Sequence, residues 1–122
     1  MELEKLTALQ LAEKIKKHEI SVTDGVKEVF SKIEEKDGYI HAYLDTYKKE
    51  AFARAKEVEK GIEDGTYTGP LAGVPIAIKD NICVQGKPTT CASKILEGFV
   101  PQYQAEVIDR LEKAGMIIIG KT

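Results

Sequence analysis

The chain has 122 residues, a length that suits one ordinary domain. Its 18 basic and 20 acidic side chains give a formal net charge of −2, which argues against a protein that binds nucleic acid or acidic membranes through an overall basic charge. Apolar residues make up 43% and charged residues 31%, a globular composition that excludes a disordered or fibrous chain.

The first helix is predicted to begin after Thr7, which forms a capping-box pattern with Gln10. A second helix follows from about Ser21 and ends near Asp37-Gly38, and residues 39–46 then lean toward strand. Both helices carry an apolar stripe at helical spacing. The stripes are Ala8, Leu11, Ala12 and Ile15 in the first helix and Val22, Val26, Val29, Phe30 and Ile33 in the second.

A third helix is predicted from about Lys48 to Lys60, with Gly61 at its end. Its apolar face consists of Ala51, Ala55, Val58 and Ile62. Charged side chains concentrate in residues 1–64, so this part is expected to be a mainly helical, solvated lead-in. Residues 65–122 are expected to supply the start of a central sheet.

Residues 65–70 form a loop by composition, and residues 74–79 alternate as a strand does. Residues 80–104 have neither helical nor strand period, and a loop of this length usually indicates function or missing partners. A helix over residues 105–114 follows, with Val107, Ile108 and Leu111 inward and Gly115 as its stop. Its successor, the unbroken apolar run of residues 116–119, is typical of a strand buried on both faces.

Strand, helix and strand in this order predict a right-handed crossover and a parallel pair. The fold class is therefore α/β, with N-terminal helices followed by a βαβ unit. A strand buried on both faces needs neighbours, and two clear strands with one weak strand are too few to flank it. We therefore expect residues 1–122 to be an incomplete fold, the N-terminal part of one larger domain.

Residues 115–122 satisfy the phosphate-binding pattern G-x-x-x-x-G-K-T. The chemistry of that pattern needs a flexible loop between a strand and a helix. Here the four middle residues are Met-Ile-Ile-Ile, which favour burial in a strand, and a helix precedes them. The pattern is therefore interpreted as a helix stop, a strand and then a turn at residues 120–122, and no ATP site is expected.

Lys79 is the stronger chemical candidate. It ends a predicted parallel strand, at the edge where α/β proteins place active sites. Strand parity sets it beside Pro75 and Ala77, whose small side chains leave room around it. A buried lysine can act as a general base because burial favours its neutral form. The alternative from the residues alone is a strand-end lysine that reaches water and pairs with Asp80.

No other side chain completes a catalytic set. Ser21 and Ser31 belong to predicted helices, and Ser93 lies in an irregular stretch whose hydroxyls would satisfy local backbone. His18 and His41 have no carboxylate or thiol partner in sequence and are expected to be structural. The two cysteines, Cys83 and Cys91, have neither metal nor redox spacing, and they are expected to be reduced thiols of a cytoplasmic protein.

The run from Gly69 to Asn81, G-P-L-A-G-V-P-I-A-I-K-D-N, resembles the lysine-bearing strand of the amidase signature family. Residues 89–101 are more selective: with residues 106–121 and the helical lead-in, they are similar to the A subunits of glutamyl-tRNA(Gln) amidotransferases within that family. They argue against the fatty-amide and allophanate hydrolases. The resemblance covers essentially the whole chain and implies a mixed central sheet flanked by helices.

The resemblance also implies a Ser–cis-Ser–Lys mechanism in which Lys79 is the lysine, with Asp80 and Asn81 as supporting neighbours. The family's two serines lie in a Gly-Ser-rich region that this sequence does not contain, so residues 1–122 alone are expected to be inactive. Glutamine would be the substrate, and its ammonia would convert Glu-tRNA(Gln) to Gln-tRNA(Gln). B and C subunits would be partners, and ATP and Mg would be used by a partner subunit, so that this chain binds no cofactor or metal.

Two other functions stay open from the sequence. The chain could belong to a stand-alone amidase of the same fold. It could also be a non-catalytic α/β interaction module.

Overall fold

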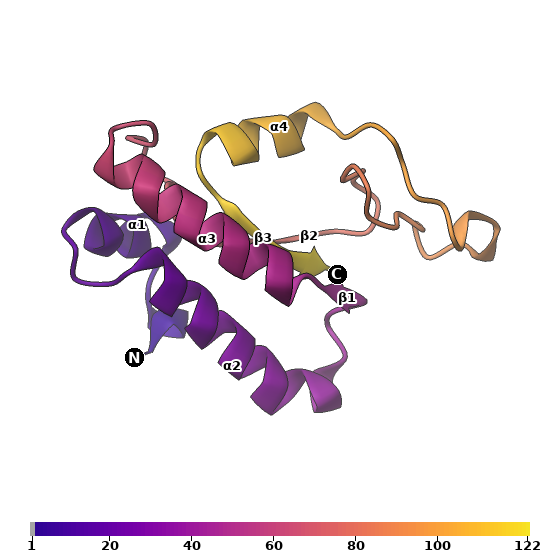
Figure 1. Ribbon diagram of the computed structural model, residues 1–122. Helices are drawn as coiled ribbons and strands as arrows, with labels where there is room; N and C mark the ends of the chain where they lie inside the picture. Colours follow the sequence, from indigo (N-terminus) through magenta and orange to yellow (C-terminus); the bar gives the residue numbers. More distant parts are fainter. Residues whose placement is uncertain (1) are drawn as a thin grey trace.

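A computed structural model describes residues 2–122 (Figure 1). A 3₁₀ turn η1 (Leu3–Lys5) and helix α1 (Ala8–Lys16) begin this part of the chain, and α2 (Val22–Ile40) follows. The short strand β1 (Asp45–Thr46), helix α3 (Lys48–Glu63) and strand β2 (Pro75–Ile78) come next. The 3₁₀ turn η2 (Lys94–Leu96), helix α4 (Glu106–Lys113) and strand β3 (Ile117–Lys121) complete the order. The expected α/β class and helical lead-in are confirmed.

The sheet has the order β1-β3-β2, so β3 lies in its centre. β2 and β3 are parallel and joined through α4, as the βαβ prediction required. β1 is antiparallel to β3, which makes the sheet mixed. A register irregularity between Ile76 and Ala77 interrupts the β2–β3 ladder.

Strand β3 is covered on both faces. Ile117 and Ile119 pack into the main core with residues of α1, α2 and α3, whereas Ile118 packs with Ile108 of α4 and Ile78 of β2. In Figure 1, α2 and α3 run side by side, and α4 lies apart from them. The apolar run at residues 116–119 therefore has the two-faced burial that its composition predicted.

Side-chain caps fix the starts of α1 and α2, and the capping box at Thr7 is the one that the sequence predicted. The Thr7 hydroxyl accepts a hydrogen bond from the Gln10 amide at 3.2 Å, and the Gln10 side chain accepts one from the Thr7 amide at 2.8 Å, which is a capping box. The Ser21 hydroxyl accepts from the Asp24 amide at 2.9 Å. These bonds satisfy amides that have no intrahelical partner, so both helices begin where the sequence placed them.

The predicted end of α2 is wrong. The helix passes through Asp37 and Gly38 to Ile40, and the turn comes at His41, which has a left-handed φ of 55°. The Asp37 carboxylate accepts from the Ala42 amide at 2.7 Å and fixes the chain beyond that turn. The stretch expected to lean toward strand is consequently helical at its start, and only Asp45–Thr46 pair as β1.

The third helix also runs further than predicted, because Gly61 lies inside α3 rather than at its end. A Cβ at Gly61 would overlap the Tyr67 ring, so the glycine makes room for that ring. Two apolar predictions fail as well: Ala8 is exposed in α1, and Val107 is 46% exposed although Ile108 beside it is fully buried. Within residues 2–122, no helix has the length and apolar character needed to cross a bilayer.

Candidate functional site

The carboxyl ends of β2 and β3 meet at one edge of the sheet. Ile78, the last residue of β2, stands opposite Lys121, the last residue of β3. Lys79 follows directly after β2, at the edge where the sequence placed it. Parallel α/β sheets have their active sites at this edge, because the loops that follow all of the strands meet there.

The environment of Lys79 differs from the prediction. Lys79 is exposed in this chain, as is Ala77 on the same side of the strand, and Pro75 is half-buried. The expectation of a buried Lys79 is therefore wrong for residues 2–122. The small residues Pro75 and Ala77 share its side of the strand as parity predicted, but Ala77 and Lys79 are both left exposed there.

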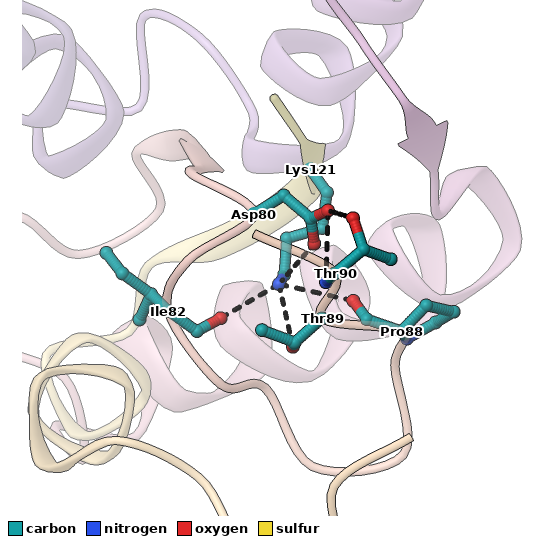
Figure 2. A network of polar contacts seen from close by, with 6 residues as sticks. All are labelled: Asp80, Ile82, Pro88, Thr89, Thr90 and Lys121. Carbon is teal, nitrogen blue, oxygen red and sulfur yellow. Dashed lines mark hydrogen bonds and ion pairs between the residues drawn. The ribbon is translucent and has the colours of Figure 1, made fainter. Parts of the chain in front are cut away.

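The buried lysine is Lys121, which is only 1% exposed (Figure 2). Its ammonium donates to the main-chain oxygens of Ile82 at 2.8 Å and Pro88 at 3.3 Å, and to the Thr89 hydroxyl at 3.2 Å. It also lies 3.4 Å from Asp80 Oδ1 in an ion pair. One ammonium thus connects the end of β3 to the residue after Lys79 and to both limbs of the loop that leaves β2.

Asp80 turns away from Lys79 and into this network. Its side chain is 9% exposed, and its second oxygen, Oδ2, accepts bonds from the Thr90 amide at 3.2 Å and the Thr90 hydroxyl. Burial raises the pKa of the Asp80 carboxyl, but the Thr90 bonds and the Lys121 ammonium together outweigh burial and hold that pKa below its ordinary value. Asp80 is therefore a carboxylate at neutral pH, and its ion-pair partner is Lys121 rather than Lys79. Asn81, the second expected neighbour, is exposed.

The phosphate-loop pattern is a strand here. Residues 117–121 form β3, and a buried lysine inside the protein cannot hold a phosphate. The prediction of a turn at residues 120–122 is nevertheless wrong for Lys121, which is the last residue of the strand.

The remaining candidates lie in a helix, in turns and in loops. Ser31 is exposed on α2, and the Ser93 amide donates to the Thr90 carbonyl at 2.8 Å in a turn. His18 and His41 both adopt left-handed φ values, 59° and 55°, at helix ends. Cys83 and Cys91 are free thiols. Among residues 2–122 there is no group of three acidic, histidine or cysteine side chains that could hold a metal ion.

A protein-family model described as Amidase matches residues 24–122. The chain belongs to the amidase family. Over its whole length it is 54% identical to the A subunit of the glutamyl-tRNA(Gln) amidotransferase of Lachnoclostridium phytofermentans and 48% identical to the same subunit of Lachnospira eligens. It spans 25% of the length of each relative.

A solved structure has the same fold. The peptide amidase PAM, in complex with the inhibitor chymostatin, superposes with a TM-score of 0.91 at 27% identity. That match covers all of this chain and 25% of the peptide amidase chain. The mixed sheet flanked by helices is thus an amidase fold, matched over about a quarter of it.

Proposed function

We propose that the protein to which residues 1–122 belong is the glutaminase subunit of a tRNA-dependent amidotransferase, with Lys79 as its general base. The observation that carries this proposal is the placement of Lys79 at the carboxyl edge of β2 in a chain that is 54% identical to an A subunit of such an amidotransferase. The lysine is exposed on the face of Pro75 and Ala77, where further protein or substrate can reach it.

In the proposed reaction, a serine outside residues 1–122 attacks the side-chain amide carbon of glutamine. Lys79 takes the serine proton through a second serine and returns a proton to the departing nitrogen, so that ammonia leaves and a glutamyl ester remains. Water then hydrolyses the ester. Asp80 is assigned no part in the proton transfers, because its oxygens bind Lys121 and Thr90 and its buried side chain turns away from Lys79.

The partners follow from the same proposal. Ammonia would pass to a B subunit that amidates Glu-tRNA(Gln), with a C subunit completing the assembly. ATP and Mg²⁺ would be used by the partner subunit, so no residue of this chain is assigned to hold them.

Two variants of the whole protein test the role of Lys79. Lys79→Ala should lower the glutaminase rate about 10⁴-fold while leaving Tm nearly unchanged, because the exposed side chain fills no cavity. Lys79→Arg should keep less than about a tenth of the rate, since a guanidinium stays protonated and cannot act as a base. Lys56→Ala, which removes an exposed lysine of α3, serves as the control and should keep the full rate. Near-normal rates for Lys79→Arg would contradict the proposal.

A stand-alone amidase is the second candidate, favoured by the close superposition on a peptide amidase. The two functions differ in coupling. An amidotransferase subunit should form Gln-tRNA(Gln) from glutamine when B and C subunits, ATP and Glu-tRNA(Gln) are added, whereas a stand-alone amidase should only release free ammonia. A protein that hydrolyses no amide in either assay would be the non-catalytic interaction module.

A further inference from the structure

The main chain on both sides of Lys79 is hydrogen-bonded to Thr122, the residue directly after β3. The Thr122 amide donates to the Ile78 carbonyl at 2.9 Å, and the Asp80 amide donates to the Thr122 carbonyl at 2.8 Å. The side chains of Ile78 and Asp80 are both buried. Since side chains alternate along an extended segment, Lys79 between them must project to the opposite, open side.

What holds Asp80 inward is the Lys121 ammonium. An ammonium has three N–H donors, and four acceptors lie within 3.4 Å of this one. A charge buried this deeply is tolerated only when it is paired and hydrogen-bonded, so Lys121 and Asp80 require each other. Neither side chain reaches the open side where Lys79 lies, and the catalytic proposal gives neither a role.

We propose that Asp80 and Lys121 are positioning residues, which set the direction of Lys79 by anchoring the main chain immediately after it. This inference rests on the proposed role of Lys79 as the base. The ion pair joins the ends of both parallel strands, and the Thr90 bonds to Asp80 extend the anchor to the far limb of the loop (Figure 2). A reacting group displaced by about 1 Å can lose on the order of 10²-fold in rate, so an anchor next to the base affects kcat strongly.

The test distinguishes a positioning role from an effect on stability alone. One variant removes a single partner of the ion pair, and a second removes both charges. In the whole protein, Lys121→Met leaves a buried carboxylate without its ammonium, and Tm should fall by at least about 5 °C. The rate constant kcat for glutamine hydrolysis should fall about 10- to 100-fold, with KM within about twofold because the pair does not touch substrate. The double variant Asp80→Asn/Lys121→Met buries no charge, so it should regain at least half of the lost Tm without regaining kcat.

A matched control and a milder variant complete the experiment. Lys87→Met removes a lysine from the same loop, where it pairs with Glu50 at 2.8 Å, and should leave kcat within about twofold of the wild type. Thr90→Val keeps the ion pair and the overall shape but removes one bond to Asp80, so it should fold normally and lower kcat at least about threefold. A double variant with both Tm and kcat restored, or a Thr90→Val protein with an unchanged kcat, would overturn the proposal.

Hydrogen exchange keeps the inference separate from the proposed function. Amides of residues 80–91 should exchange faster in the double variant than in the wild type, at equal distance from each protein's Tm. Unchanged exchange there refutes the anchor even if Lys79 proves catalytic. Faster exchange in a protein without amidase activity would instead show that the anchor is right and the assigned reaction is wrong.

Discussion

Gly120 is the position in β3 where a single methyl group should do the most damage. A Cβ there would overlap the Asp45 carbonyl oxygen of β1 and lie 3.0 Å from Thr46 Cα and 3.1 Å from the Tyr43 ring. Two of these neighbours are main-chain atoms, which cannot rotate away. Relief requires β1 to move off β3, and this threatens the hydrogen bonds that flank it: Leu44 amide to Lys121 carbonyl and Tyr47 amide to Ile119 carbonyl, both 2.8 Å.

The cost of Gly120→Ala can be bounded in two ways. Overpacking a filled site costs about 1–3 kcal/mol. Losing the two flanking hydrogen bonds costs about 1 kcal/mol each. Both routes give about 2 kcal/mol, so the variant should be destabilised by that amount whichever way the strand yields.

The same substitution at Gly38 provides the control. Gly38 lies in α2, and no atom outside the helix's own backbone lies within 4 Å of the place that its Cβ would take. Gly38→Ala should therefore stabilise the helix by about 0.5–1 kcal/mol. Thermal melting of the whole protein measures both variants, and hydrogen exchange at the Leu44 and Tyr47 amides locates the damage. A Gly120→Ala protein as stable as Gly38→Ala, with unchanged exchange at those amides, would refute the close approach of β1 to β3.

Two further predictions concern stability against pH. Burial raises the pKa of Tyr47 to about 12, and its hydroxyl has no hydrogen-bond partner among residues 2–122. With respect to ionisation of Tyr47, stability is fully present below the ordinary tyrosine pKa near 10 and is lost as the pH rises toward 12, so Tyr47→Phe should remove this alkaline loss. The substitution also removes a buried hydroxyl that has no partner, so it should raise stability at pH 7 by up to about 1 kcal/mol. The lowered pKa of Asp80 has the opposite sign: its contribution is present above the ordinary aspartate pKa near 4 and is lost as the pH falls through the lowered value. Measuring the free energy of unfolding of each variant between pH 2 and 12 would check both predictions. An Asp80→Asn protein that loses as much stability at acid pH as the wild type would contradict the prediction for Asp80, and a Tyr47→Phe protein less stable than the wild type at pH 7 would contradict the prediction for Tyr47.

Local chemistry made the helix starts and the strands of the βαβ unit predictable. Thr7 and Ser21 satisfy amides within three residues, and the apolar run of β3 carries its own signal of burial. The end of α2 was not predictable in this way, because helix propensity favours a break at Gly38 over one at His41. The Asp37 carboxylate instead stabilises the turn at His41 by accepting a hydrogen bond from the Ala42 amide. The prediction that Gly61 ends α3 was wrong for a similar reason, because the Tyr67 ring, which needs a glycine at that position, lies beyond the helix.

The candidate site shows the same division between local and distant information. The position of Lys79 at the carboxyl edge of a parallel strand followed from the order of elements and strand parity, whereas its exposure depends on what covers that face. The partners of Lys121 come from residues 80, 82, 88 and 89, so no local spacing reveals them. One signal was available: a lysine that continues a strand buried on both faces must find an acid. Between residues 65 and 105 only Asp80 and Glu97 are acidic, and only Asp80 follows the strand paired with β3. The Asp80–Lys121 pair could thus have been derived from topology and charge together.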